Sequence, residues 1–257
     1  MELKLDLHVH GELSPDSLLT IEQTAALCRE RGMDGFALCN HDVSHLSPTE
    51  IDGILVIPGI EISTAEGHLL GLFLEQPVAP TKDFSEAVRR IHTAGGIAVL
   101  AHPYQKRRQT NSEIDARLDR IGGELDGIEV FNSRAEQSKD GANAAALAAA
   151  KRMGLPGFAG SDAHLPSEIG NVYVTVTVPE KTLPAIKASL LAGGGAYTGR
   201  LSDPLNTARS QRIKLKKNAA PQYKHCKNLI YRVKCMTRRK IMKREPVSGT
   251  LPVGKNI

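Results

Sequence analysis

Hydrophobic and polar positions follow two alternating periods through the first 200 residues. Short apolar runs with strand-like alternation are each followed by a segment with the spacing of an amphipathic helix. Capping residues support these boundaries, since Thr20 is placed to begin one helix and Gly32 to end it. Such alternation is typical of a parallel α/β sheet or barrel. We expect strands at KLDLHVH, FALCN, ILVIPGIEIS, HLLGLFL, IAVLAHP, GIEVFN, GFAGSDAH and VYVTVTV, and helices near 20–31, 84–94, 112–121, 141–153 and 180–192.

The pattern changes after Arg200. The stretch LSDPLNTARSQRIKLKKNAAPQYKHCKN has no clear period, whereas NLIYRVKCMTRRKIMKRE places its large apolar residues on one helical face. The final segment, PVSGTLPVGKNI, predicts a flexible end. We therefore expect an α/β domain over residues 1–200 and a basic, partly helical or flexible C-terminal extension over residues 201–257.

Charge is divided unevenly along the 257 residues. Residues 200–257 hold 16 Lys and Arg against only Asp203 and Glu245, a net charge of +14, while residues 1–199 carry −9. Three interpretations of this extension stay open: contact with an anionic membrane surface, contact with nucleic-acid phosphates, or no dedicated partner. No apolar run reaches the roughly 18 residues of a transmembrane helix, and the N-terminus lacks the features of a secretory signal, so we expect a cytoplasmic protein.

Residues that can bind a metal occur at the ends of the expected strands. His8 and His10 point to the same face of one strand because side chains alternate across it, so both imidazoles could reach one ion. In a parallel barrel the carboxyl ends of the strands converge on one mouth, where active sites are built. The other polar residues at expected strand ends are His41, Glu61, His102, Asn132, Asp162 and His164.

Two more residues extend this set of ligand types. Asp16 lies in a turn, SPDS, and His68 begins the run HLLGLFL, so the candidates number nine without Asn132. Nine imidazoles and carboxylates exceed the needs of one ion, because zinc takes about four ligands and manganese about six. We expect two or three divalent metal ions, with Mn²⁺ favoured and Fe²⁺ or Zn²⁺ as alternatives. Such a centre suits phosphoryl chemistry, since it activates water and neutralises phosphate charge.

The ordered motifs HVH, SPDS, NHD, GIEIS, HLLG, AHP and GSDAH closely resemble those of the PHP (polymerase and histidinol phosphatase) family of metal-dependent phosphoesterases. The likeness covers about residues 1–200. It implies a distorted (β/α)₇ barrel, similar to a TIM barrel, with a trinuclear metal centre at the C-terminal mouth. Some family members have a cysteine or histidine ligand where this chain has Asn132. The histidine at position 68 is similar to that of the nucleotide phosphatase-like branch.

The resemblance also implies a role for each ligand. His8, His10 and Asp162 would hold a first ion, and Glu61 would bridge it to a second. His68 and His102 would complete the second site, and Asp16, His41 and His164 the third. The residues expected to be catalytic are Glu61, Asp162 and His164.

We therefore expect an enzyme that hydrolyses a phosphate ester of a small metabolite or nucleotide through metal-activated water. The alternatives are a 5′–3′ exonuclease guided by the basic extension, and a non-catalytic metal-stabilised binding module. Arg134 could clamp a phosphate, because a guanidinium pairs with two phosphate oxygens, or it could be a solvated loop arginine. The basic run 106–108 could attract an anionic substrate or be solvated in the same way.

Overall fold

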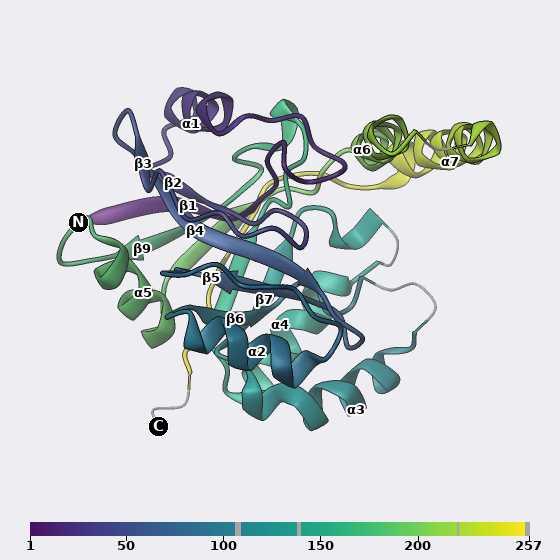
Figure 1. Ribbon diagram of the computed structural model, residues 1–257. Coiled ribbons are helices and arrows are strands. Elements are labelled where there is room, and N and C mark those ends of the chain that lie inside the picture. The colour runs from purple at the N-terminus through teal and green to yellow at the C-terminus, as the bar shows by residue number, and fades with distance from the viewer. Residues whose placement is uncertain (106–108, 138–139, 220, 255–257) are drawn as a thin grey trace.

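The computed structural model describes residues 1–105, 109–137, 140–219 and 221–254. Its centre is one curled, mixed β-sheet with helices packed on its outer side (Figure 1). The strand order is β11-β10-β9-β1-β2-β4-β5-β6-β7-β8, and β3 pairs with β4. The strands are β1 (Glu2–Val9), β2 (Gly35–Leu38), β3 (Glu50–Ile51), β4 (Ile54–Ser63), β5 (His68–Leu72), β6 (Ile97–Leu100), β7 (Gly127–Asn132), β8 (Gly157–Gly160), β9 (Val172–Thr177), β10 (Ala196–Gly199) and β11 (Val247–Thr250).

The five helices expected in the first 200 residues are present. Thr20 caps the first of them with a reciprocal capping box, and Asp83 caps the second through its side chain. The last begins later than expected, because Thr182 is its N-cap and Pro184 lies in its first turn. These helices are α1 (Ile21–Glu30), α2 (Phe84–Thr93), α3 (Asn111–Ile121), α4 (Ala142–Met153) and α5 (Leu183–Ala192).

The sheet curls until its two sides approach each other. Val9, at the end of β1, forms a parallel bridge with Ala163, and the His10 amide donates to the Ala163 carbonyl at 2.8 Å. Gly160 permits this approach, because a Cβ added there would lie 2.3 Å from the Cβ of His8. The expected α/β class is therefore confirmed with a curled sheet, whereas the distorted (β/α)₇ barrel stays a prediction.

The strands are less regular than the expected parallel alternation. Strand β5 lies antiparallel to both β4 and β6, and β9 lies antiparallel to β1. Strands β4 and β5 are joined by a short turn, in which the Thr64 amide donates to the Gly67 carbonyl, and a short connection can only join antiparallel neighbours. As a consequence, His68 at the start of β5 lies at the same edge of the sheet as the carboxyl ends of β4 and β6.

One expectation for the C-terminal segment, its flexible end, was wrong. A helix, α6 (Pro204–Lys217), occupies the stretch without a clear period, and its buried residues include the polar Asn206 and Ser210 and the small Ala208. Its inner face therefore shows no hydrophobic period. The end of the chain forms β11, which pairs antiparallel with β10, and Leu251 is buried in the core. The expected flexible end is in fact part of the sheet.

A second helix, α7 (Gln222–Ile241), lies beside α6 at the outer edge of the molecule (Figure 1). The pair is fixed to the body, because the Lys217 ammonium donates to the carbonyls of Glu12, Ser14 and Ser17 at 2.7–2.9 Å. Among the described helices, including the 20 residues of α7, none combines the length and hydropathy of a membrane crossing. The domain boundary at residue 200 stays a prediction.

Candidate metal centre

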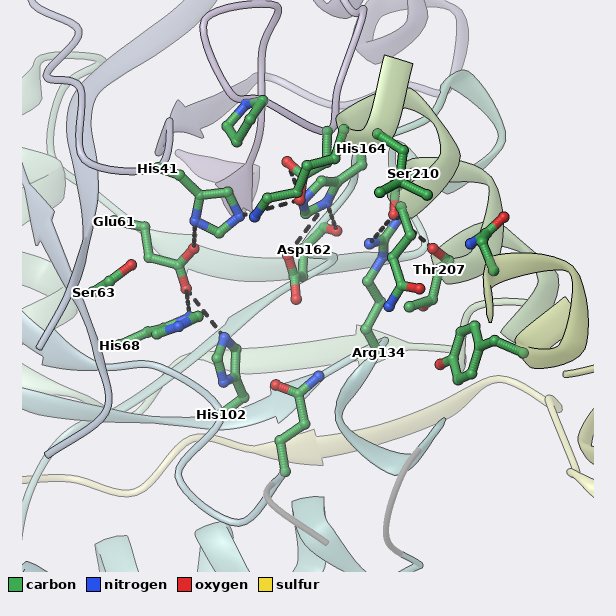
Figure 2. Close-up of a pocket in the computed structure, with 18 of the residues that line it drawn as sticks. His41, Glu61, Ser63, His68, His102, Arg134, Asp162, His164, Thr207 and Ser210 are labelled. Carbon is green, nitrogen blue, oxygen red and sulfur yellow. Dashed lines mark hydrogen bonds and ion pairs between the residues drawn. The ribbon is translucent and has the colours of Figure 1, made fainter. Parts of the chain in front are cut away.

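The nine candidate ligands come together at one mouth of the curled sheet. Figure 2 shows part of this group around the Glu61 carboxylate, with imidazoles approaching from several strands. The residues come from β1 and the loop after it, from the ends of β2, β4, β6 and β8, and from the start of β5. They are His8, His10, Asp16, His41, Glu61, His68, His102, Asp162 and His164.

Glu61 lies at the centre of this group. Its Oε1 lies 2.9 Å from His68 Nδ1 and 3.1 Å from His102 Nε2. Its Oε2 lies 2.8 Å from His41 Nδ1 and 3.4 Å from His10 Nε2. This buried carboxylate therefore contacts imidazoles on both sides, which is the position that a bridging ligand would need.

A second set of atoms converges beside Glu61. His8 Nε2 and His10 Nε2 face each other at 3.1 Å, and His10 Nε2 lies 3.2 Å from Asp162 Oδ1. His164 Nδ1 lies 3.5 Å from that same oxygen, and Asp16 Oδ1 lies 3.4 Å from His164 Nε2. Three groups bring their ligand atoms within 4.8 Å of one another: His8, His10 and Asp162; Glu61, His68 and His102; and His10, His41 and His164.

The donor chemistry of this site fits divalent cations. Among the described residues, Glu61 Oε2 and Asp16 Oδ1 are buried oxygens that face imidazole nitrogens but form no well-directed hydrogen bond, an arrangement that a cation would stabilise. The Nε2 atoms of His8 and His10 likewise point toward each other, so that one ion could contact both. Nitrogen and carboxylate oxygen without thiolate suit borderline to hard ions.

The ionisable groups of this cluster shift one another's pKa values. Burial would raise the pKa of Glu61, but His68, His41 and His8 hold it well below its usual value. Burial would lower the pKa of His8, but the carboxylates of Glu129, Asp162 and Glu61 raise it well above its usual value. The pKa values of His41 and His102 are also raised, against the effect of burial, mainly by Glu61. Without metal, the cluster therefore retains protons on several imidazoles.

Metal binding should accordingly release protons and strengthen as pH rises. A metal needs neutral imidazoles, and the raised pKa values of His8, His41 and His102 keep these protonated to higher pH than a free histidine. Calorimetric titration of the apo-protein with Mn²⁺ between about pH 6 and about pH 9, in buffers of different ionisation enthalpy, would count the protons. Binding that is independent of pH and releases no protons would contradict this description of the cluster.

Several residues that support the candidate ligands were missed by the sequence reasoning. Glu129 is buried in β7; its Oε1 lies 3.0 Å from His8 Nδ1, and its Oε2 accepts from the His102 amide at 2.9 Å. Ser14 Oγ lies 3.1 Å from His10 Nδ1. Hydrogen bonds at the outer nitrogen fix the ring orientation of a metal-binding histidine. A single acidic residue within the apolar run GIEVF was the available signal for Glu129.

Three other polar residues stand outside the group of nine. Asn132 donates to Glu129 Oε2 at 3.0 Å and to Asp162 Oδ2 at 3.4 Å. Asp42 accepts from the Ser63 amide at 2.9 Å, so it orders the backbone beside the cluster. Asp6 accepts from the Ser161 amide at 2.9 Å, and burial raises its pKa to about 7.

The backbone at two candidate ligands is in an unusual conformation. His102 has φ +30° and Asp162 has φ +54°, in the left-handed region that residues with a Cβ seldom adopt. Such residues cost about 1–3 kcal/mol each and persist only where the surrounding structure holds them. Here the strained positions follow directly after β6 and β8, and they turn both side chains toward the cluster.

The cluster opens into a cavity of about 830 Å³. Its opposite wall comes from α6 and α7 and carries three lysines, Lys214, Lys224 and Lys227. The basic run 106–108, which we considered for substrate attraction, lies outside the described residues. The α6–α7 wall was not expected to reach the site, because the sequence does not show how the C-terminal segment folds back.

Arg134 also lines the cavity, but its guanidinium is held by a buried partner. Its Nε donates to Glu168 Oε1 at 2.9 Å, and its Nη2 forms an ion pair with Glu168 Oε2. Its Nη1 donates to Ser210 at 3.2 Å, as Figure 2 shows. The role of Arg134 as a phosphate clamp stays a prediction, and a bidentate clamp would have to displace Glu168.

Comparisons with known proteins agree with this geometry. A family model described as PHP-associated matches residues 140–194. The uncharacterised protein MJ0417 of Methanocaldococcus jannaschii is 32% identical over 174 residues, which cover 67% of this chain and 70% of that protein. A probable phosphatase of Shewanella sp. strain MR-4 is 28% identical over 213 residues, covering 70% of this chain and 84% of the relative.

Among solved structures, the chain is similar to a two-domain protein from Bacteroides vulgatus, described as containing a predicted PHP-like metal-dependent phosphoesterase. The TM-score is 0.59 at 24% identity, over 84% of this chain and 70% of the other, so this likeness concerns the fold. The family model, the relatives and the motifs around the cluster all indicate the same group of proteins. The chain belongs to the PHP family of metal-dependent phosphoesterases.

Proposed function

We propose that this protein hydrolyses a phosphate ester of a small metabolite or nucleotide at the metal centre described above. The observation that carries the proposal is the convergence of nine imidazoles and carboxylates at one mouth of the sheet, where seven of them line one cavity. The name of the Shewanella relative supports phosphatase activity. The similarity to the nucleotide phosphatase-like branch stays a prediction.

Two or three divalent ions fit this set of ligands, with Mn²⁺ favoured. His8, His10 and Asp162 would hold the first ion, His68 and His102 the second, and Glu61 would bridge them. The third would lie among Asp16, His41 and His164. Asp16 Oδ2 lies 3.7 Å from His41 Nε2, and Asp16 Oδ1 lies 3.4 Å from His164 Nε2. Bound ions of this kind lower the pKa of a water molecule and neutralise charge on phosphate oxygens.

The side chains of the chain then orient the reactants. Asp162 presents Oδ1 to His10, and its Oδ2, which accepts from Asn132 at 3.4 Å, is the oxygen that we propose as the proton acceptor for an attacking water. Glu61 keeps four imidazoles in fixed positions, and the Asp162 carbonyl holds His164 Nδ1 at 2.8 Å. We propose catalytic roles for Glu61, Asp162 and His164 on this basis.

The shape and charge of the cavity favour an anionic organic substrate. A volume of about 830 Å³ is far larger than one phosphate requires and lies in the range of sites for drug-sized ligands. The lysines on the α6–α7 wall raise the local concentration of anions, while the metal cluster lies on the other side. The same wall also favours the exonuclease alternative.

Metal analysis with a substrate screen tests the proposal. We expect the purified protein to contain divalent metal and to hydrolyse a phosphomonoester, with activity lost on chelation and restored by Mn²⁺, Fe²⁺ or Zn²⁺. The panel should compare sugar phosphates, mononucleotides, dinucleotides and longer oligonucleotides at several salt concentrations. A preference for oligonucleotides with a steep salt dependence would support the exonuclease instead. Hydrolysis that persists unchanged in a strong chelator would overturn both.

A further inference from the structure

The 20-residue helix α7 has two contrasting faces. Its inner face is attached to the body: Asn228 donates to the Ala208 carbonyl at 3.2 Å, Cys235 is buried, and Arg238 forms an ion pair with Asp140. This face also contributes to the wall of the catalytic cavity. The packing needs of α7 are therefore met on one side only.

The opposite side of α7 exposes large apolar side chains. With 100° of rotation per residue they lie within an arc of about 140°. Exposed apolar residues scattered singly are ordinary, but a contiguous row on one helix marks a contact surface. This outer face of α7 consists of Leu229 (60% exposed), Ile230 (61%), Val233 (60%), Met236 (55%) and Ile241 (69%).

Positive charge borders the outer face on both sides. By the same helical rotation, Arg232 follows one border and Lys234 the other, and both are exposed, whereas Arg239, beside Arg232, forms an ion pair with Asp203. Lys240 falls within the arc and can extend its ammonium past the apolar row. Residues 204–244 contain 14 Lys and Arg and no Asp or Glu, so positive charge predominates near this face although Asp140 and Asp203 pair with Arg238 and Arg239.

These two properties together select one kind of partner. A second copy of the chain would bring like charges together across the interface. Nucleic acid would use the positive charge but not a row of aliphatic side chains, which cannot stack on bases as aromatic rings do. An anionic lipid surface uses both, because apolar side chains enter the boundary between headgroups and acyl chains while the bordering cations meet the headgroups.

We propose that the outer face of α7 binds an anionic lipid surface, with the helix lying in the plane of the membrane. The inner face of the same helix lines the catalytic cavity, so binding would hold that cavity next to the membrane. The ion pair of Arg238 and the amide of Asn228 keep α7 in register with the body while its outer face is in contact.

Vesicle sedimentation with the full-length protein tests this proposal. Vesicles of phosphatidylcholine with about 30 mol% phosphatidylserine should sediment the protein, and pure phosphatidylcholine should not. Leu229→Ser with Val233→Ser removes two apolar contacts without changing charge, and should weaken vesicle binding about tenfold or more. Val247→Ser, at a 47% exposed apolar residue of β11 outside α7, is the matched control and should bind like the wild type.

Because both substituted side chains are exposed, the variant should retain the circular dichroism spectrum and thermal midpoint of the wild type. Three results would overturn the proposal. The first is that the wild type stays in the supernatant with anionic vesicles. The second is that the double variant sediments as strongly as the wild type. A micromolar dimer or an oligonucleotide complex that depends on Leu229 and Val233 would instead assign the face to a second copy or to nucleic acid.

Discussion

Replacing His10 with alanine should lower kcat/KM of the metal-supplied enzyme by about 10³-fold or more, which is about 4 kcal/mol of lost transition-state stabilisation. His10 Nε2 lies 3.1 Å from His8 Nε2, 3.2 Å from Asp162 Oδ1 and 3.4 Å from Glu61 Oε2. His10 also belongs to two of the three candidate groups, so one substitution removes a ligand atom from both. Steady-state kinetics on the substrate found by the screen, together with metal content by mass spectrometry, measures the loss.

His92→Ala is the matched control for this substitution. His92 lies on α2, its side chain is 45% exposed, and it forms an ion pair with Asp126 instead of contacting the cluster. We expect this variant to keep the wild-type rate and metal content. If His10→Ala kept them as well, the nine residues would not form the catalytic centre.

Replacing Glu168 with glutamine should lower the free energy of unfolding by about 3–5 kcal/mol, because it leaves the buried guanidinium of Arg134 without its counter-charge. Glu168 is fully buried and accepts hydrogen bonds from Arg134, from the Ser202 hydroxyl and from the His164 amide. These contacts join the loop after β8 to the loop after β7 and to the segment before α6. Urea unfolding followed by circular dichroism measures the change.

A surface ion pair and a double variant provide the controls for Glu168. Arg29→Ala breaks a pair with Asp52 in which both side chains are more than half exposed, and should change stability by less than about 1 kcal/mol. Arg134→Met combined with Glu168→Gln should be less destabilised than the sum of the two single variants, since no unpaired charge remains. If the changes in unfolding free energy were additive in this cycle, the two side chains would not stabilise each other.

Much of the α/β body could be predicted from local signals. Capping residues such as Thr20 and the spacing of apolar positions located the five helices of the first 200 residues. The candidate ligands could be identified because polar residues that interrupt apolar strands stand out. His8 and His10, two residues apart on one strand, are the simplest case, and the structure places their Nε2 atoms 3.1 Å apart.

Other features depend on long-range contacts that no local pattern shows. Strand β5 reverses direction because of a short turn at Thr64, which looks like any other loop in the sequence. Helix α6 buries the polar residues Asn206 and Ser210. Burial of Ser210 is possible because Arg134, 76 residues away in the sequence, donates to the Ser210 hydroxyl. Glu129 gives only the weak signal of one acid in an apolar run, and its role depends on the approach of β7 to β1.

The pairing of β10 with β11 shows how the helical hairpin is connected to the rest of the fold. Gly199 pairs with Val247, so residues 200–246 leave and re-enter the sheet at adjacent positions. The segment 200–246 is therefore an insertion between the two strands of a β-hairpin, and a tight turn of about two residues could connect the same two strands. Such a shortened chain could keep the pairing of β10 with β11, but it would lose the contacts of Ser202 with Glu168 and of Lys217 with the loop after β1, so the inserted segment supports the body as well as the cavity wall.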